Sequence, residues 1–311
     1  MSSEPRFDAP LFGGIEAGGT KFVCAAGGPE GAVMKKAVVA TTTPDTTMPE
    51  VIEFFRSCHR IRPLSAIGLA SFGPVDLDPA SPTYGYITTP PKPGWSNYDI
   101  VGALKKALGL PIGFDTDVNG AALGEYRWGA ARGLDTFIYV TVGTGIGAGG
   151  MVSGKLMHGL IHPEMGHMLI PKDPRDKFEG GCPFHGGMCL EGLASGPAIQ
   201  KRWGKPASEL PPDHPAWDLQ AQYLALAFAN CVMVLSPQKI ILGGGVSKQK
   251  HLYPVIREKL RRLLNGYIKH DKILTDTDSY VVEPGCGEES GIRGALALAE
   301  QAFAEKERAL V

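Results

Sequence analysis

Four side chains with metal-binding chemistry fall within one short stretch of the sequence. Cys182, His185 and Cys189 have the spacing C-x2-H-x3-C, and His167 lies a short loop upstream. Thiolate sulfur and imidazole nitrogen are ligands that zinc prefers, and four such ligands complete a tetrahedral shell. The pattern therefore predicts a structural zinc site formed by His167, Cys182, His185 and Cys189. The alternative is that the cysteines are ordinary core residues, but the glycine pairs at 180–181 and 186–187 would make a poor core segment.

The loop around this cluster, residues 162–191, carries a carboxylate near each end, Glu164 and Glu191. Loops of this length without regular structure are usually functional or disordered. A bound metal ion would hold the loop in place although it has no core of its own. The sequence therefore favours a functional loop.

Two glycine-rich hairpins share one pattern. Residues 14–28 read as strand, tip and strand, and the tip is formed by Gly18, Gly19, Thr20 and Lys21. Residues 141–154 repeat this pattern about 125 residues later, which can mark an internal duplication. The second tip is formed by Gly143, Thr144 and Gly145. Exposed backbone N–H groups at such tips suit phosphate, although most Gly-Gly tips are only turns. A third glycine run, Gly243, Gly244 and Gly245, follows a predicted strand at 239–242 and precedes a predicted helix from about 247 to 267, an arrangement that lets a backbone approach a nucleotide closely.

One carboxylate, Asp117, lies between a predicted strand at 111–115 and a predicted helix at 120–129. An acid at the end of a strand and the start of a helix is stabilised as an anion and can face a cleft. The alternative is that Asp117 only caps the helix. Aromatic residues interleaved through 76–98 leave a similar choice, between a surface loop and the wall of a sugar site.

Composition excludes several classes of protein. The chain has 311 residues, a hydrophobic fraction of 43% and a formal net charge of −1, which favours about two globular domains and no nucleic-acid or membrane partner. No apolar run approaches the roughly 20 residues needed to span a bilayer, and no signal peptide is evident at the N-terminus. Six cysteines in a chain of this length do not make a disulfide framework. We therefore expect Cys24, Cys58, Cys231 and Cys286 to be free thiols and the protein to be cytoplasmic.

Five motifs in order resemble the ROK family of sugar kinases, of the actin/hexokinase superfamily, and its bacterial fructokinase branch in particular. Residues 14–21 and 141–148 resemble the two phosphate motifs, and 243–245 the adenosine motif. Residues 117–125 resemble the segment with the catalytic aspartate, and 164–167 with 191–197 resemble the sugar-and-zinc signature. The resemblance covers about residues 11–303.

The resemblance implies an α/β fold of two duplicated, ribonuclease H-like lobes with a cleft between them. We expect an N-terminal lobe at 1–116, joined by a C-terminal helix at 290–308 that packs back on it. The C-terminal lobe would span 117–289 and contain the zinc loop. A homodimer is what the family implies.

The implied activity is ATP-dependent phosphorylation of a hexose at O6, with D-fructose as the expected hexose, Asp117 as general base and Mg²⁺ accompanying ATP. Asn119, Glu164, His167 and Glu191 would bind the sugar, and the three glycine motifs would bind the nucleotide. Glu16 and Asp117 would lie near Mg²⁺.

Several positions depart from the common glucokinase pattern. Thr116 stands where many ROK glucokinases have Asn, His185 replaces one of three zinc-binding cysteines at a shifted spacing, and Glu16 replaces the usual Asp. With the loop at 89–95, these changes favour fructose over glucose. Alternatives on the same scaffold are a glucokinase, a mannokinase, an N-acylhexosamine kinase, or a sugar-binding regulator without catalysis.

Overall fold

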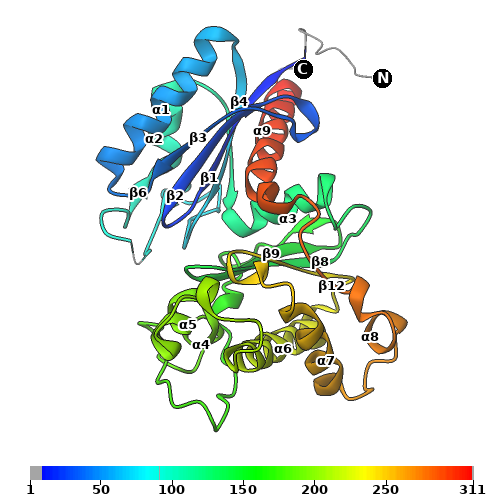
Figure 1. Ribbon diagram of the computed structural model, residues 1–311. Helices are drawn as coiled ribbons and strands as arrows, with labels where there is room; N and C mark the ends of the chain where they lie inside the picture. Colours follow the sequence, from blue (N-terminus) through cyan, green and yellow to red (C-terminus); the bar gives the residue numbers. More distant parts are fainter. Residues whose placement is uncertain (1–8, 91, 310–311) are drawn as a thin grey trace. The chain divides into compact units, whose positions relative to one another are not determined.

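The computed structural model describes residues 9–90 and 92–309 and divides the chain into two compact units (Figure 1). Unit 1 runs to Gly129 and also contains His158–His162 and the C-terminal segment from Glu289. Unit 2 comprises Ala130–Met157 and Pro163–Glu288. The chain thus passes between the units more than once, and residues distant in sequence share one core.

Unit 1 is built on a five-stranded sheet with the order β3-β2-β1-β4-β7. Its strands are β1 (Leu11–Ala17), β2 (Lys21–Gly27), β3 (Val33–Ala40), β4 (Leu64–Ser71) and β7 (Ile112–Thr116), and a small separate ladder joins β5 (Tyr86–Ile87) to β6 (Tyr98–Asp99). Its helices are α1 (Pro44–Ile61), α2 (Ile100–Leu108), α3 (Asp117–Trp128) and α9 (Ser290–Ala309). The first three strands pair antiparallel, whereas β4 runs parallel to both β1 and β7.

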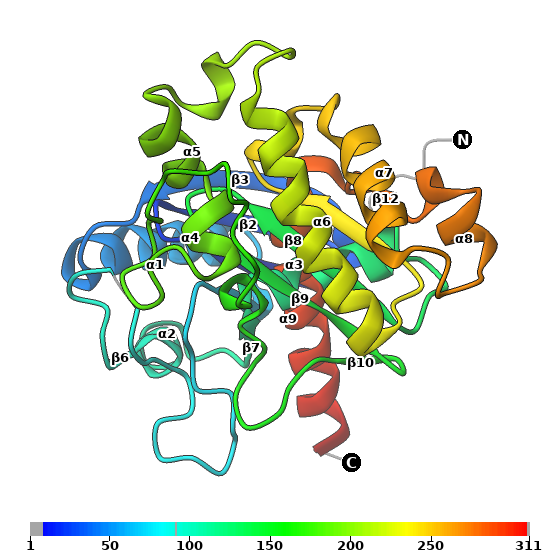
Figure 2. The ribbon, with the colours of Figure 1, turned by 90° about the horizontal axis from the view of Figure 1, so that it is seen from below.

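Unit 2 contains a second five-stranded sheet, with the order β10-β9-β8-β11-β12. Its strands are β8 (Phe137–Val142), β9 (Ile146–Val152), β10 (Lys155–Leu156), β11 (Ile240–Gly243) and β12 (Val281–Val282). Its helices are α4 (Leu190–Ala194), α5 (Gly196–Trp203), α6 (Ala216–Leu235), α7 (Leu252–Leu264) and α8 (Asp271–Leu274). Figure 2 shows α6 and α7 side by side, and residues of both helices pack in one core with the sheet.

The two sheets have the same topology. Each begins with a hairpin and a third antiparallel strand, then adds two parallel strands on the other side of the first strand. The glycine tips at 18–21 and 143–145 occupy the same place, between the first two strands of each sheet. The expected duplicated α/β lobes are therefore confirmed.

The boundary between the units differs from the expected one because α3 packs against α9. The expected boundary lay at residue 116, but the division follows Gly129 because α3 packs along α9, and α9 in turn packs on β4 and β1. The predicted helix at 247–267 also differs from the structure. A 3-10 turn, Val246–Lys248, comes first, and α7 begins only at Leu252.

One helix, α6, differs from the expectation that no segment is long and apolar enough to span a bilayer. By length and composition it is long and apolar enough to cross a bilayer, although half of the residues in its apolar window are buried inside the protein. Tyr223, Leu224 and Phe228 are at most 1% exposed and belong to the core of unit 2. These contacts are those of a core helix, which passes the same test of length and hydropathy.

Glycines allow the close approach of α3 and α9. A Cβ atom at Gly294 of α9 would lie 1.6 Å from the carbonyl oxygen of Gly120 in α3, and one at Gly124 would lie 2.3 Å from that of Ser290. Gly68 of β4 approaches α9 equally closely, since its Cβ would meet the Ala295 carbonyl oxygen at 1.8 Å. The helices can pack at this distance only without side chains at these positions.

We expect Gly294→Ala to lower the free energy of unfolding by about 2 kcal/mol, because the backbone clash outweighs the roughly 1 kcal/mol that alanine gains in helix propensity. Urea denaturation measures the change. Gly28→Ala is the matched control, because its φ is −88° and nothing lies within 4 Å of the added Cβ. The control should change stability by no more than about 0.5 kcal/mol. Equal stability of Gly294→Ala and the control would contradict the packing argument.

Candidate functional site

The carboxyl ends of the parallel strands in unit 1 bring the first glycine tip and Asp117 to one edge. Ala17 of β1 pairs with Ser71 of β4, which pairs with Thr116 of β7. Gly18 and Asp117 follow these aligned residues, so their backbones lie about 10 Å apart, two strand spacings across the sheet. Ligands of open α/β sheets bind at this edge. The tip itself is accessible, with Gly19, Thr20 and Lys21 all exposed.

The first turn of α3 fixes Asp117. Thr116 is the N-cap, and its hydroxyl oxygen accepts the Asn119 backbone N–H at 3.1 Å. Asp117 is therefore the first residue of the helix and not its cap, with one carboxylate oxygen 2.9 Å from the Val118 backbone nitrogen. The N-terminal turn of a helix stabilises an anion. Asn119 is only 1% exposed, and its side-chain amide donates to buried Asp115 at 2.9 Å.

A second carboxylate of unit 1, Glu16, lies beside the start of α9. A Cβ atom at Gly291 would come within 2.4 Å of the Glu16 carboxyl carbon. Burial raises the pKa of Glu16, and the charges of Lys21 and Lys36 oppose this rise only in part. Ionised Glu16 is thus costly in the protein alone, a cost that a cation at this edge would offset.

This pKa shift predicts how stability responds to pH. Because the folded-state pKa of Glu16 lies above its unfolded value, the cost of ionisation is absent below the unfolded pKa and complete above the folded one. We expect Glu16→Gln to raise the melting temperature at pH 8, without added metal, and to leave it nearly unchanged at pH 4. Thermal denaturation at both pH values measures this. A gain of the same size at both would exclude ionisation as its cause.

In unit 2, two glycine motifs meet at the carboxyl ends of neighbouring strands. Gly243 of β11 pairs with Thr141 of β8, and β8 leads into the second tip, residues 143–145. Gly244 has φ +89° and lies against β8, since its Cβ would be 2.5 Å from the Val142 carbonyl oxygen. Gly243 is buried under Tyr139, whereas Gly245 is exposed with open space around it. The accessible backbone of this motif is therefore Gly244–Gly245.

Glu191 of α4 links the second tip to the metal-binding residues. One oxygen of its carboxylate accepts the Ile146 backbone N–H at 2.9 Å, and the other lies 3.9 Å from Nε2 of His167. Gly145 permits this approach, because a Cβ there would lie 2.7 Å from the same carboxylate. Burial, and then the negative charge of Glu191, raise the pKa of Glu164. Two acids and one imidazole thus form a polar group suited to hydroxyl ligands.

The four proposed zinc ligands lie together. One donor atom from each of His167, Cys182, His185 and Cys189 falls within 4.8 Å of the others. Nδ1 of His167 lies 3.7 Å from both Cys182 Sγ and Cys189 Sγ, and Nδ1 of His185 lies 3.6 Å from Cys182 Sγ. Zinc–sulfur and zinc–nitrogen bonds of ordinary length give a tetrahedral edge of about 3.6 Å. The donor set and its spacing therefore fit a zinc ion.

Short backbone pairings build this cluster. Leu169 pairs with Cys189, and Cys182 pairs with Gly186, whose φ is +55°. The first pairing places His167 beside Cys189, and the second closes the turn that carries His185. Burial raises the pKa of the Cys189 thiol to about 11, so a thiolate there requires a cation.

A buried ionic network anchors the same loop to the helices of unit 2. The Asp176 carboxylate accepts from the guanidinium of Arg202 at 3.1 and 3.0 Å and from the hydroxyl of Tyr223 at 2.6 Å. Arg202 also donates to the Leu193 carbonyl of α4 at 2.7 Å. Removing one partner would leave a buried charge unpaired. The network therefore fixes the middle of the loop, at Asp176, to helices α5 and α6.

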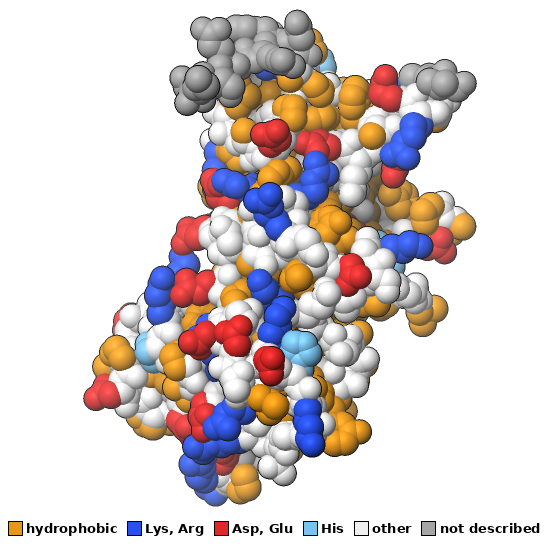
Figure 3. All heavy atoms as spheres, turned by 90° about the vertical axis from the view of Figure 1, so that its right-hand side faces the viewer, with side chains coloured by type: hydrophobic (Ala, Val, Ile, Leu, Met, Phe, Trp, Pro, Cys, Tyr) orange, Lys and Arg blue, Asp and Glu red, His pale blue; other side chains and the backbone are white. Residues whose placement is uncertain are grey.

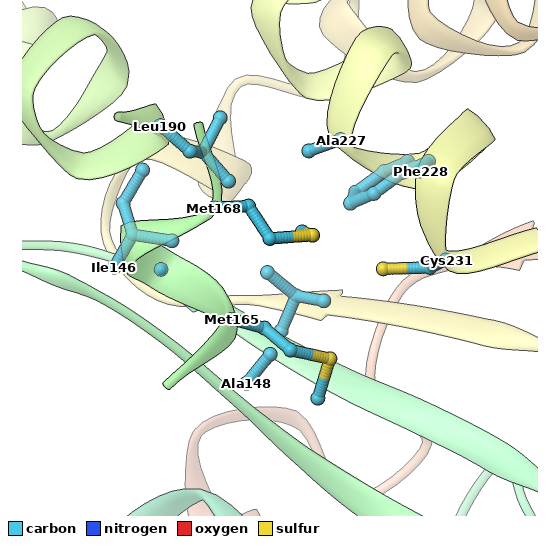
Figure 4. Close-up of a pocket in the computed structure, with 10 residues that line it drawn as sticks. Ile146, Ala148, Met165, Met168, Leu190, Ala227, Phe228 and Cys231 are labelled. Carbon is cyan, nitrogen blue, oxygen red and sulfur yellow. The ribbon is translucent and has the colours of Figure 1, made fainter. Parts of the chain in front are cut away.

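Apolar packing supports the short 3-10 turn Met165–His167 from behind. Figure 4 shows Met165 and Met168 facing Leu190 and Phe228 around a cavity of about 10 Å³. Its lining is apolar, so it offers a water molecule little to bind.

On the face shown in Figure 3, acidic and basic side chains are interspersed and form no large patch of one sign.

The predicted residues thus fall into two groups, each within one unit. Unit 1 holds the first tip, Asp117 and Asn119, and unit 2 holds the other two glycine motifs, Glu164, Glu191 and the metal cluster. Sequence reasoning missed Asp115 and His158, which hydrogen-bond at 2.8 Å, because a pairing 43 residues apart leaves no local pattern. The aromatic residues of 76–98, which include Trp95, were expected to lie in a surface loop or to line a sugar site. Trp95 is 0% exposed, lies in the core of unit 1 and donates to the Thr42 carbonyl at 2.7 Å. Pro91, in the same loop, lies outside the described residues.

Comparison with known proteins agrees with these motifs. The family model described as "ROK family" matches residues 12–302. A fructokinase of Pediococcus pentosaceus is 46% identical over 94% of this chain and 99% of its own length. A fructokinase of Zymomonas mobilis is 44% identical over 94% of this chain and 97% of its own length.

A solved structure extends the likeness to the fold. It is a ROK family glucokinase from Streptomyces griseus, determined in complex with glucose and AMPPNP. It superposes with a TM-score of 0.73 at 26% identity and covers 94% of this chain and 99% of its own. The expected actin/hexokinase-like fold class is thereby confirmed. With a family model that spans nearly the whole sequence and relatives this similar over their full length, the chain belongs to the ROK family.

Proposed function

We propose that this protein is an ATP-dependent fructokinase, which transfers the γ-phosphoryl group of ATP to O6 of D-fructose. The observation that carries the proposal is the similarity of 42–48% identity to fructokinases over 94% of this chain in the longest alignments. The positions of the motif residues support it. In each unit, glycine tips and acids lie at the carboxyl edge of a sheet, where α/β proteins bind ligands.

Asp117 is assigned the role of general base. It accepts the proton of the attacking hydroxyl, which makes the oxygen a better nucleophile toward the γ-phosphorus. Its place in the first turn of α3 supports the ionised form. Mg²⁺, when bound with ATP, would offset phosphate charge, and Glu16 and Asp117 are the carboxylates proposed to face it.

The sugar is assigned to Glu164, His167, Glu191 and Asn119. Carboxylates accept hydroxyl protons, and an imidazole nitrogen can donate or accept. Nδ1 of His167 points into the cysteine cluster and Nε2 points toward Glu191. Zinc bound at Nδ1 would fix the tautomer and leave the Nε2 proton available to an acceptor. The metal would therefore act by fixing the orientation of His167.

The nucleotide is assigned to the glycine motifs. Gly18, Gly19, Thr20, Lys21, Gly143, Thr144 and Gly145 are proposed to bind the phosphates, and the run at 243–245 the adenosine, with Gly244 and Gly245 as its accessible part. We also propose a cytoplasmic homodimer. Cys24, Cys58 and Cys231 are buried free thiols, which is consistent with a reducing compartment. Light scattering after gel filtration tests the dimer.

A substrate panel tests the function. With ATP and Mg²⁺, fructose should give a kcat/KM at least tenfold above those of glucose, mannose and N-acetylmannosamine, and the product should carry phosphate on O6 by NMR. Glucose as the best substrate would replace the fructose assignment and retain a hexose kinase. Absence of phosphoryl transfer to all four sugars by the zinc-loaded protein would exclude the proposal.

A further inference from the structure

The short segment His158–His162 is held to unit 1 by its two terminal histidines. The His158 Nε2 atom lies 2.8 Å from Oδ2 of Asp115 at the end of β7. The Val75 backbone N–H donates to Nε2 of His162 at 3.1 Å, and His162 is only 5% exposed. Each histidine thus makes a specific hydrogen bond, although no catalytic motif includes either residue.

Asp115 is the centre of the first of these contacts. Its carboxylate is 2% exposed. One oxygen accepts the Thr116 backbone N–H at 2.7 Å and the side-chain amide of Asn119 at 2.9 Å, and the other accepts from His158. Two of the three donors come from β7 and the first turn of α3, and His158 is the only one from elsewhere in the chain among these contacts. A buried carboxylate that loses a donor is expected to rearrange, because an unsatisfied buried charge is costly.

The geometry also defines the proton on His158. A hydrogen bond to the Asp115 carboxylate requires hydrogen on Nε2, and this bond is the main cause that raises the pKa of His158. The imidazole is partly exposed, with 46% of its side-chain surface accessible, while the carboxylate is enclosed. His158 therefore shields Asp115 from water on that side and supplies a directed donor.

We propose that His158 and Asp115 are positioning residues for phosphoryl transfer: they fix the side-chain amide of Asn119 and, with it, the first turn of α3 that carries Asp117. Asn119 is fixed twice, since its backbone N–H binds Thr116 and its side chain binds Asp115. The inference rests on the proposed function for Asp117. It adds two residues that act on the base through the helix and that need not touch the sugar.

Kinetics with ATP and fructose tests the pair. We expect His158→Leu to lower kcat about tenfold and to leave KM for ATP within about twofold. His158→Gln keeps an N–H donor at a similar distance from the backbone and should restore kcat to within about threefold of wild type. His270→Leu is the control, because this exposed histidine also uses its ring in a local contact, with the Lys272 backbone N–H. It should leave kcat unchanged.

A double-mutant cycle separates positioning from general destabilisation. In an Asn119→Ala background, His158→Leu should lower kcat less than about twofold, because the group that His158 positions is gone. Equal losses in the two backgrounds, or wild-type kcat in His158→Leu, would overturn the proposal. Asp115→Asn should reproduce the loss and should also be insensitive to further replacement of His158.

A readout without catalysis guards against variants that fail to fold. In wild-type protein labelled with ¹⁵N-histidine, the Nε2 proton of His158 should give a resolved signal that exchanges slowly with water. The ring protons of His270 should exchange too fast to observe. Exchange of the His158 proton as fast as that of His270 would refute the hydrogen bond. If no hexose is phosphorylated but this signal is present, the proposed function fails and the structural pair stands.

Discussion

Asp117→Asn lowers kcat for fructose phosphorylation by about 10²–10⁴-fold, while KM for fructose changes less than about threefold. The amide is close in shape to the carboxylate and can still accept the Val118 backbone N–H that Asp117 accepts at 2.9 Å. It cannot take a proton from the attacking hydroxyl at neutral pH. The loss therefore falls on the chemical step, and steady-state kinetics with ATP in excess measures it.

The matched control is Asp271→Asn. Asp271 is also the first residue of a helix, α8, and is exposed. Both variants lose an interaction between a carboxylate and a helix N-terminus, worth at most about 1 kcal/mol at exposed Asp271 and up to about 2 kcal/mol at partly buried Asp117. Similar melting temperatures with a large difference in kcat would identify Asp117 as the base. If Asp117→Asn kept kcat within tenfold of wild type, another group would have to accept the proton.

The placement of the candidate site residues was largely predictable from sequence because the motifs that carry them are local. A glycine tip between two strands, a carboxylate between a strand and a helix, and the spacing C-x2-H-x3-C each lie within about ten residues, so the pattern itself specifies the geometry. The repeat of the hairpin also predicted the duplicated topology. Residues 14–28 and 141–154 do occupy equivalent positions in the two sheets.

The features that could not be predicted from the sequence depend on packing between residues far apart in the chain. The division of the units depends on contacts between α3 and α9, whose glycines at 120 and 294 meet across more than 170 residues of chain. Trp95 was expected to lie in a surface loop or to line a sugar site, because its segment is rich in proline and glycine and carries aromatic residues that suit a sugar ring. It is buried because its ring packs against Phe22 and Phe72, which come from other strands and loops. Composition alone cannot distinguish an aromatic core anchor from a ligand contact.

The orientation of Asn119 shows the same limit within the site. The resemblance to ROK sugar kinases implied a sugar contact for Asn119. The structure places its side chain against Asp115, a residue whose burial follows from β7. Asn119 can bind the sugar and also hold the start of α3 only if its side-chain amide contacts both the sugar and Asp115. The double-mutant cycle of His158→Leu with Asn119→Ala tests the second of these roles.

If the cluster binds zinc as proposed, Cys182→Ala should abolish zinc binding and raise KM for fructose at least tenfold, with KM for ATP within about twofold. The Cys182 thiol lies close to both imidazoles, with Sγ at 3.7 Å from Nδ1 of His167 and 3.6 Å from Nδ1 of His185. Its loss leaves three donors, and loss of one ligand from a four-ligand site abolishes most of the binding energy that folds the loop. We expect the melting temperature to fall by about 5 °C. Metal analysis, kinetics and thermal denaturation of the same preparation measure the three effects.

Cys286→Ala is the control, because Cys286 is a partly buried cysteine that lies outside the four-residue cluster. It should retain zinc and wild-type KM values. Chelation of the wild-type protein should reproduce the rise in KM for fructose, and added Zn²⁺ should reverse it, whereas Cys182→Ala should not respond. The decisive result is a rise in KM for fructose without a rise in KM for ATP. We expect it because His167 joins the metal cluster through Nδ1 and approaches Glu191 through Nε2. If zinc were lost and KM for fructose stayed constant, the cluster would stabilise its loop without orienting the sugar-binding residues. The positions of Glu164 and Glu191 would then depend on α4 and the second glycine tip alone.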